Sequence, residues 1–292
     1  MGSRLPFSRL FSSPSLNTQN SLEVIGVLKL IIQSAHIDGP DGILQWRQPN
    51  PSVTVILDDR QVETGVQAAT YDPTWITSTF YLLVKSPEED MTLRVHDQGK
   101  YRKHRIIGEA FLAMKHLLDS RVQLNVQLPF LKHHKRRGDL LCSMFYFPVI
   151  PSQENDSNIG VVRLTVQRAE NLGQAGDNSI FSSRISALVA RIRLALNAAP
   201  IHVTPPANKL EDGSAVWESV HDFLCFDKTA CVLYIDVVDR HSRDPLLGHI
   251  CVCLTDVIEA ADVKRGPWPL SGSAAGRLAV SAEWKSLDLE VV

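Results

Sequence analysis

The sequence predicts an all-β protein made of two tandem antiparallel β-sandwiches, and three observations support this fold class. A strand-like opening at residues 26–30 reappears at residues 160–164, and each copy then leads to a tryptophan, Trp75 or Trp217. Short apolar or alternating segments separated by turn residues follow in both copies. Solenoid units span only a few tens of residues, so each of these longer repeats needs a core of its own.

In the first copy, turn signals such as Asp58-Asp59 and Ser86-Pro87 separate the apolar segments. The predicted strands are residues 26–34, 52–57, 61–68, 77–84, 91–97, 106–114, 122–128 and 138–149. Residues 115–118 predict one helical turn. Eight short strands with this spacing favour an antiparallel sandwich.

Segments of the second copy repeat this order. Its predicted strands are residues 160–168, 187–196, 201–204, 216–226, 231–238, 247–254 and 276–284. Residues 255–261 take the place of the short helix. We therefore predict two tandem eight-stranded antiparallel β-sandwiches of Greek-key topology.

The predicted domain boundaries follow from composition. Residues 1–22 form a serine-rich leader that is disordered or truncated, although its basic, acid-free composition also resembles a mitochondrial transit peptide. Residues 23–150 form the first domain and residues 159–290 the second. The polar stretch 151–158 between them predicts a short flexible linker.

Charge and cysteine content differ along the chain. Residues 1–150 hold 17 Lys and Arg against 14 Asp and Glu, and residues 151–292 hold 13 against 18, so the two copies carry net charges of opposite sign. The five cysteines lack the spacing of a disulfide framework, which indicates a reducing compartment. Cys251 and Cys253 share one strand face, and we expect buried strand residues there rather than a metal site.

Several motifs occur in a regular order along the chain. They are Asp72-Pro73-Thr74-Trp75, Arg137-Gly138-Asp139-Leu140, Asp244-Pro245-Leu246-Leu247-Gly248 and Trp268-Pro269-Leu270. In these motifs the chain resembles tandem C2 domains, and more narrowly the first two C2 domains of fungal tricalbins, relatives of the extended synaptotagmins. The resemblance covers about residues 22–290.

The resemblance implies contact with phospholipid membranes, tethering of the endoplasmic reticulum to the plasma membrane, and a link to lipid transport. It also implies a cytoplasmic location peripheral to these membranes, and tricalbin-like proteins as partners. Such proteins carry a membrane hairpin and a lipid-transfer domain ahead of the C2 domains. Only the serine-rich leader stands there in this sequence, so we assign no lipid transfer to it.

Calcium-binding C2 domains place about five aspartates on two loops at one end, because Ca²⁺ takes six to eight oxygen ligands. In the first copy Asn50 replaces a first-loop aspartate, and of the third-loop set only Asp97 remains, the other positions holding glycine, histidine and arginine. In the second copy Asp239 and Asp244 remain. We therefore predict calcium independence and no cofactor, with Asp97, Asp239 and Asp244 as the remaining metal-ligand candidates.

Two basic runs stand near these loops. They are Lys100, Arg102, Lys103 and Arg105 in the third loop, and Lys132, Lys135, Arg136 and Arg137 before the eighth strand. Alternating strand directions would bring both runs to one end, beside the apolar first-loop residues Ile43, Leu44 and Trp46. We predict that this end binds anionic phospholipid, with the apolar residues inserting. The alternatives are a merely solvated charged face and a Trp46 that folds back onto the sandwich.

Other function classes have less support. Nucleic-acid binding is not expected, since no array of base-stacking aromatic residues accompanies the basic runs. The sequence contains no nucleophile elbow, zinc-protease motif or phosphate-binding glycine loop, so we predict that it is not an enzyme. Two alternatives to the calcium-independent membrane module remain, a protein-interaction scaffold of degenerate C2 domains and a calcium-dependent membrane sensor.

Overall fold

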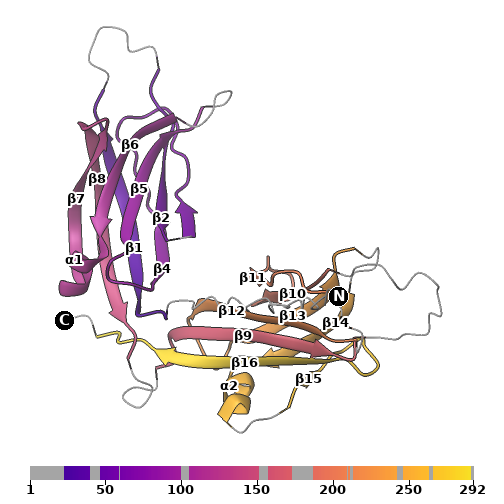
Figure 1. Ribbon diagram of the computed structural model, residues 1–292. Helices are drawn as coiled ribbons and strands as arrows, with labels where there is room; N and C mark the ends of the chain where they lie inside the picture. The colour runs from indigo at the N-terminus through magenta and orange to yellow at the C-terminus, as the bar shows by residue number, and fades with distance from the viewer. Residues whose placement is uncertain are drawn as a thin grey trace, which may run out of the picture.

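The computed structural model describes residues 23–39, 47–58, 60–99, 105–150, 157–172, 187–208, 210, 213–241, 246–262 and 266–290. In the first domain the elements are β1 (Gly26–Ile37), β2 (Pro51–Leu57), β3 (Arg60–Glu63), β4 (Thr79–Val84), β5 (Asp90–Asp97), β6 (Arg105–Ala113), α1 (Met114–Asp119), β7 (Val122–Lys132) and β8 (Lys135–Pro148). Their strands form the sandwich that stands upright in Figure 1.

The first sandwich has two four-stranded layers, β3-β2-β5-β6 and β7-β8-β1-β4, in which all paired strands are antiparallel. The layers join at one edge, where β6 and β7 pair at Glu109 and Leu131. Inward-facing residues of β1 such as Leu28, Leu30 and Ile32 are fully buried between the layers. The alternation of apolar and polar residues that predicts these strands therefore also builds the core.

The second domain repeats this architecture. Its elements are β9 (Gly160–Glu170), β10 (Leu188–Arg193), β11 (His202–Val203), β12 (Ala215–Cys225), β13 (Val232–Asp239), β14 (Leu246–Cys253), α2 (Leu254–Asp262), β15 (Trp268–Pro269) and β16 (Arg277–Ser286). The layers are β11-β10-β13-β14 and β12-β9-β16-β15, the same order as in the first domain. The predicted fold of two eight-stranded sandwiches is confirmed, and β11 and β15 are each only two residues long.

The register makes the two domains comparable residue by residue. Gly26 pairs with Val84 in the first domain, and Gly160 pairs with Cys225 in the second. Each opening glycine packs closely against a large aromatic side chain, Tyr146 for Gly26 and Trp284 for Gly160. A Cβ added to Gly26 would lie 2.4 Å from the Tyr146 hydroxyl oxygen, and one added to Gly160 would lie 2.4 Å from the backbone oxygen of Lys285. The repeat seen in the sequence is thus a repeat of strand pairing and close packing.

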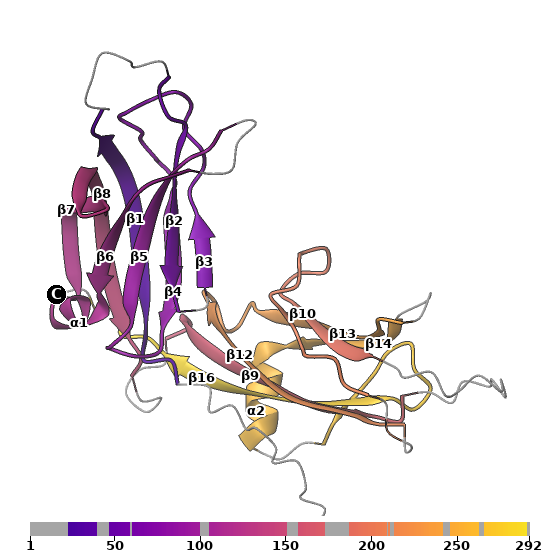
Figure 2. The ribbon, with the colours of Figure 1, turned by 45° about the horizontal axis from the view of Figure 1, so that its top comes forward.

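An apolar cluster joins the two domains. It consists of the buried residues Val24, Val27, Leu83, Val161 and Leu287, with Phe147, Val149, Ile159 and Leu224 packed against them. Val149 and Leu287 also form an antiparallel bridge. Figures 1 and 2 show the second sandwich lying across the lower end of the first. Outward-facing strand residues of each domain are therefore covered by the other domain.

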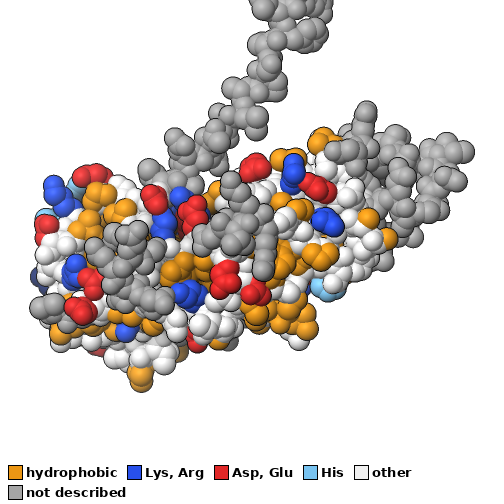
Figure 3. Space-filling view, turned by 90° about the horizontal axis from the view of Figure 1, so that it is seen from below, with side chains coloured by type: hydrophobic (Ala, Val, Ile, Leu, Met, Phe, Trp, Pro, Cys, Tyr) orange, Lys and Arg blue, Asp and Glu red, His pale blue; other side chains and the backbone are white. Residues whose placement is uncertain are grey.

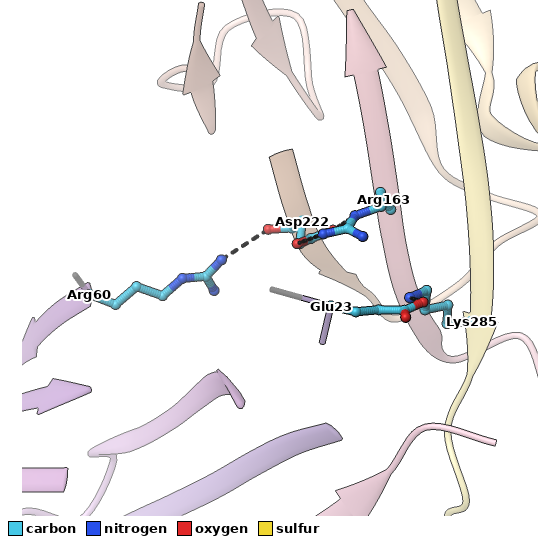
Figure 4. Close-up of polar contacts among 5 residues, drawn as sticks. All are labelled: Glu23, Arg60, Arg163, Asp222 and Lys285. Carbon is cyan, nitrogen blue, oxygen red and sulfur yellow. Dashed lines mark hydrogen bonds and ion pairs between the residues drawn. The ribbon is translucent and has the colours of Figure 1, made fainter. Parts of the chain in front are cut away.

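Polar contacts also lie at the junction of the two domains, as Figure 4 shows. The Arg60 guanidinium reaches across the junction and donates to the carbonyl oxygen of Asp222 at 3.1 Å. The buried Asp222 carboxylate also pairs with Arg163 at 3.1 Å, and Lys285 pairs with Glu23. Ion pairs with a buried member are costly to break, because removal of one partner leaves a desolvated charge.

The exposure of two cysteines differs from the sequence-based expectation. Cys251 and Cys253 are exposed, so the prediction that they are buried was wrong. They share the outer face of β14, because Ile250 and Val252 fill the inner face. The predicted domain boundaries stay a prediction, and residues 1–22 and 151–156 lie outside the described residues. No helix in the described part of the chain is long and apolar enough to cross a bilayer.

Candidate functional site

The candidate site is the loop end of the first domain, which we define as the connections that follow β1, β3, β5 and β7. The register places these connections together: Pro51 pairs with Asp97, which in turn pairs with Arg105. The backbone N–H of Asp38, just after β1, donates to the carbonyl of Arg137 at 2.8 Å. This end lies at the top of the upright sandwich in Figure 1.

A tight hairpin carries the second basic run. Lys132 pairs with Lys135, and the two residues between them, His133 and His134, have φ of 50° and 63°. Positive φ at both central positions is typical of the type I′ turn, whose twist matches that of the flanking strands. The hairpin therefore holds its lysines side by side at the loop end.

Gly138 allows this hairpin to lie against the rest of the sandwich. Its φ of 141° is unfavourable for other residues, and an added Cβ would lie 1.9 Å from the carbonyl oxygen of His36 and 2.5 Å from the Phe130 ring. Phe130 is fully buried. The glycine thus couples the position of the basic hairpin to the core.

The structure brings part of both basic runs together. The Lys132 ammonium donates to the carbonyl of Ile106 at 2.7 Å, which places the hairpin beside Arg105 at the start of β6. Arg136 pairs with Asp139, so its charge is compensated. Arg105, Lys135 and Arg137 form no ion pair with an acid in the described ranges, and Lys135 is exposed. The predicted residues Lys100, Arg102, Lys103, Ile43, Leu44 and Trp46 lie outside the described residues.

Acidic groups at the same end are mostly engaged. His36 and Asp72 form an exposed pair at 2.6 Å, and the hydrogen bond that His36 makes to the Asp72 carboxylate raises the pKa of His36. Seen from below in Figure 3, the molecule shows basic and acidic side chains interspersed with apolar ones. The loop end therefore carries several described bases that form no ion pair, namely Arg105, Lys135 and Arg137.

Asn50 ties three of the connections together. Its side-chain oxygen accepts from the backbone N–H of Ala69 at 2.9 Å, and its amide nitrogen donates to the carbonyl of Gln98 at 3.1 Å. Its own backbone N–H donates to the Asp97 carboxylate at 2.9 Å. Three further bonds among the side chains of Ser52, Glu63 and Gln98 continue this network. The loop end is thus organised by hydrogen bonds between side chains and backbone.

The comparison with known families is consistent with this geometry. The chain matches the C2 domain family over residues 26–129 and 160–269. The chain belongs to the C2 domain family. It contains two C2 domains in tandem, and the resemblance stated from its motifs is confirmed.

Two relatives of this tandem are tricalbin-1 and tricalbin-2 of Saccharomyces cerevisiae, at 23% and 21% identity over 297 residues. Each alignment covers 98% of this chain but 24% of the relative, so the chain spans about a quarter of the length of the curated relatives it matches.

Two solved structures of a tandem pair of C2 domains from extended synaptotagmin 2, one of them calcium bound, superpose with TM-scores of 0.70 and 0.68. They are 18% and 16% identical, and the matches cover 92% and 98% of this chain and 99% and 100% of those chains. At this level of identity the likeness shows the fold.

Within the described ranges no group of three or more His, Cys, Asp and Glu is placed to hold a metal ion. Asp97 accepts a hydrogen bond from the backbone N–H of Asn50, and the Asn50 side-chain amide is bonded to Ala69 and Gln98. Asp239 accepts from the N–H of His241 at 3.0 Å, and Asp244 lies outside the described residues.

Sequence reasoning missed three features of this region. It did not find the structural task of the Asn50 side chain, the His36–Asp72 pair, or the contact between the domains. The position of Asn50 between Pro49 and Pro51 is the one signal in the sequence, because flanking prolines restrict the backbone that presents the amide. Pairs that form between distant loops leave no periodic pattern.

Proposed function

We propose that this tandem C2 module binds phospholipid membranes without calcium, through the loop end of its first domain. The observation that carries the proposal is the hairpin of Lys132 and Lys135 lying beside Arg105 at the same end. Each Lys or Arg near an anionic leaflet contributes about 1 kcal/mol, falling off within a Debye length of about 8 Å. Three or four such residues support weak, salt-sensitive attachment.

Calcium independence rests on the way in which the loop end is held. In a calcium-binding loop end the ion joins carboxylates from separate loops. Here the Asn50 amide joins the connections after β1, β3 and β5 by neutral hydrogen bonds. Because these bonds need no cation, the basic side chains are positioned in its absence.

By likeness to the tricalbins, we further propose a role as a peripheral tether at membrane contact sites, linked to lipid transport, with tricalbin-like proteins as partners. The cytoplasmic faces of the endoplasmic reticulum and plasma membrane are the locations this implies. The second, acidic domain then faces a partner or acts as a spacer.

The test is co-sedimentation with vesicles of phosphatidylcholine alone or with 20–30% phosphatidylserine, roughly the charge of an anionic leaflet, at two salt concentrations, in calcium or chelator. We expect binding that requires phosphatidylserine, persists in chelator and weakens with salt. The double variant K135Q/R137Q should weaken it by about 25-fold, since each lost base removes about 1 kcal/mol.

The matched control is K115Q/R277Q, which removes two exposed bases outside the loop end of the first domain and should change the affinity less than about twofold. Binding that needs calcium would favour the sensor alternative. Folded protein that binds no vesicle under any condition would contradict the proposal and favour an interaction scaffold.

A further inference from the structure

Two histidines stack across one edge of the second sandwich. His221 lies on β12 in one layer and His202 on β11 in the other, and their rings are close to parallel, at 13°, with centroids 4.5 Å apart. The Nε2 atom of His202 also lies 2.9 Å from the Ser219 hydroxyl oxygen. His221 is in register with the core residue Leu164 of β9, so its half-buried ring faces the interior. The stack therefore connects the two layers at the edge that β11 and β12 form.

The first domain has apolar residues at the same two places. The strand registers make Phe80 the equivalent of His221 and Val62 the equivalent of His202. Phe80 and Val62 both pack against the first core. The shared sandwich can therefore close this edge without a titratable group, and the histidine pair is specific to the second domain.

The stack lies next to the junction of the two domains. Asp222, the residue after His221, has its side chain on the opposite face of β12, where its carboxylate pairs with Arg163 of β9. Its carbonyl oxygen accepts the hydrogen bond from Arg60 of the first domain at 3.1 Å, as Figure 4 shows. The backbone that presents His221 to the stack is thus the backbone to which the first domain is bonded.

Bases from three segments act on His221. They are His202 on β11, Arg60 on β3, and Lys85, which follows β4 and lies 3.2 Å from the Asp58 carboxylate. A proton on His221 would therefore repel the two bases of the first domain. A second proton on His202 would place two positive rings with their centroids 4.5 Å apart. In the neutral stack these repulsions are absent.

We propose that the His202–His221 stack is an acid-sensitive latch, which holds the two domains together when it is neutral and releases the first domain from the second when it is protonated. The repulsion is relieved when β11 moves away from β12 and when Arg60 leaves the Asp222 carbonyl. The loop end of the first domain then turns relative to the second domain. This inference does not depend on membrane binding.

Burial determines the direction of the pH effect. It lowers the pKa of both histidines, and together with the nearby bases it brings the pKa of His221 to about 4. The released state then binds protons more readily than the docked state, so the latch stabilises docking fully above pH 6.5 and less as the pH falls toward 4. A release that restores the ordinary pKa of 6.5 to His221 shifts the docking equilibrium about 30-fold between pH 7.5 and pH 5.

Two acidic groups at the junction keep their charge over this pH range. Hydrogen bonds from Lys285 and Arg121 lower the pKa of Glu23 and of Asp288, respectively. Both carboxylates therefore stay ionised at pH 5. A response of the junction between pH 7.5 and pH 5 thus points to the histidines.

The test is amide hydrogen exchange of the full chain at pH 7.5 and pH 5, with each rate divided by the intrinsic rate at that pH. The N–H groups of Ile150 and Asp288 are the probes, because they donate across the junction to the carbonyls of Ser286 and Pro148. We expect the protection of both probes to fall about 30-fold at pH 5. Ile235, in the inner strand β13, should stay better protected than the probes at both pH values, because the second core remains folded when the junction opens.

The matched variant is His202→Val with His221→Phe, which copies Val62 and Phe80 of the first domain. Its probes should change in protection by less than about twofold between the two pH values. Exposed His241→Gln is the control and should respond like the parent protein.

Three results would overturn the latch. The first is constant protection of the probes in the parent protein, and the second is an equal fall in the double variant. The third is equal protection of Ile235 and the probes, which would mean that the junction opens only when the second domain unfolds.

Discussion

The loop ends of the two domains stand on the same strand frame but are held differently. Asp97 and Asp239 occupy equivalent positions, yet Asp97 accepts from Asn50 across the loops, whereas Asp239 accepts from His241 two residues along the chain. Ala187 stands where the first domain has Asn50, as the equivalent backbone bonds to Asn50 and Ala187 show. The alanine side chain can neither donate nor accept a hydrogen bond. Asn50 thus adds side-chain ties between the connections that Ala187 does not supply.

The largest effect should come from Gly138→Ala, which disturbs the strand packing that supports the first loop end. The new Cβ would collide with the His36 carbonyl in a backbone conformation that alanine avoids. We expect a loss of about 3 kcal/mol in the free energy of unfolding, measured by urea denaturation. Gly65→Ala is the control, since its Cβ would meet nothing within 4 Å. Equal losses in both variants would show that Gly138 is not special.

Asn50→Ala should make the first loop end resemble the second. It removes the bonds to Ala69 and Gln98 and should cost about 1.5 kcal/mol, with faster amide hydrogen exchange at Ala69. The exposed Gln48→Ala is the control and should be neutral. Unchanged exchange in Asn50→Ala would mean that the connections are held by the strands alone.

The histidines of the two domains should respond to acid in opposite directions. Burial lowers the pKa of His221 to about 4, so the unfolded chain binds a proton that the folded domain rejects. The second domain should then lose stability as the pH falls from 6.5 toward 4, by up to about 1.4 kcal/mol per pH unit for this proton. His36 has a raised pKa, so its stabilising contribution is present below pH 6.5 and is lost as the pH rises.

Thermal unfolding between pH 4.5 and 7.5 measures this difference. His221→Phe should flatten the profile of the second domain, because it removes the group stacked on His202 at 4.5 Å. Exposed His241→Gln is the control and should leave the profile unchanged. A profile that keeps its slope in His221→Phe would contradict the assignment.

The smallest effect separates the bases within the first loop end. Lys135→Gln should weaken binding to anionic vesicles about fivefold, since one base contributes about 1 kcal/mol. Arg136→Gln combined with Asp139→Asn should weaken it less than about twofold, because the ion pair that it removes carries no net charge. Co-sedimentation at low salt measures both. Equal losses would show that charge alone, and not pairing, decides the contribution of each base.

The repeated order of strands was predictable, because sandwich strands bury alternate residues and the chain shows that alternation twice. The same logic failed at Cys251 and Cys253, where apolar character suggested burial while Ile250 and Val252 already filled the inner face. The alternation of apolar and polar residues also did not predict the junction between the two domains. Val27 and Val161 lie at outward-facing positions that only the neighbouring domain covers.

By itself, then, the sequence determined the two sandwiches, their strand order, the family, and the presence of basic runs beside loops poor in acids. Periodicity and motifs are local, so a single chain displays them. The tertiary structure decided which bases keep an uncompensated charge and how Asn50 ties the connections. The Asn50 bonds join residues far apart in the chain that folding brings within hydrogen-bond distance, and no local pattern records that proximity.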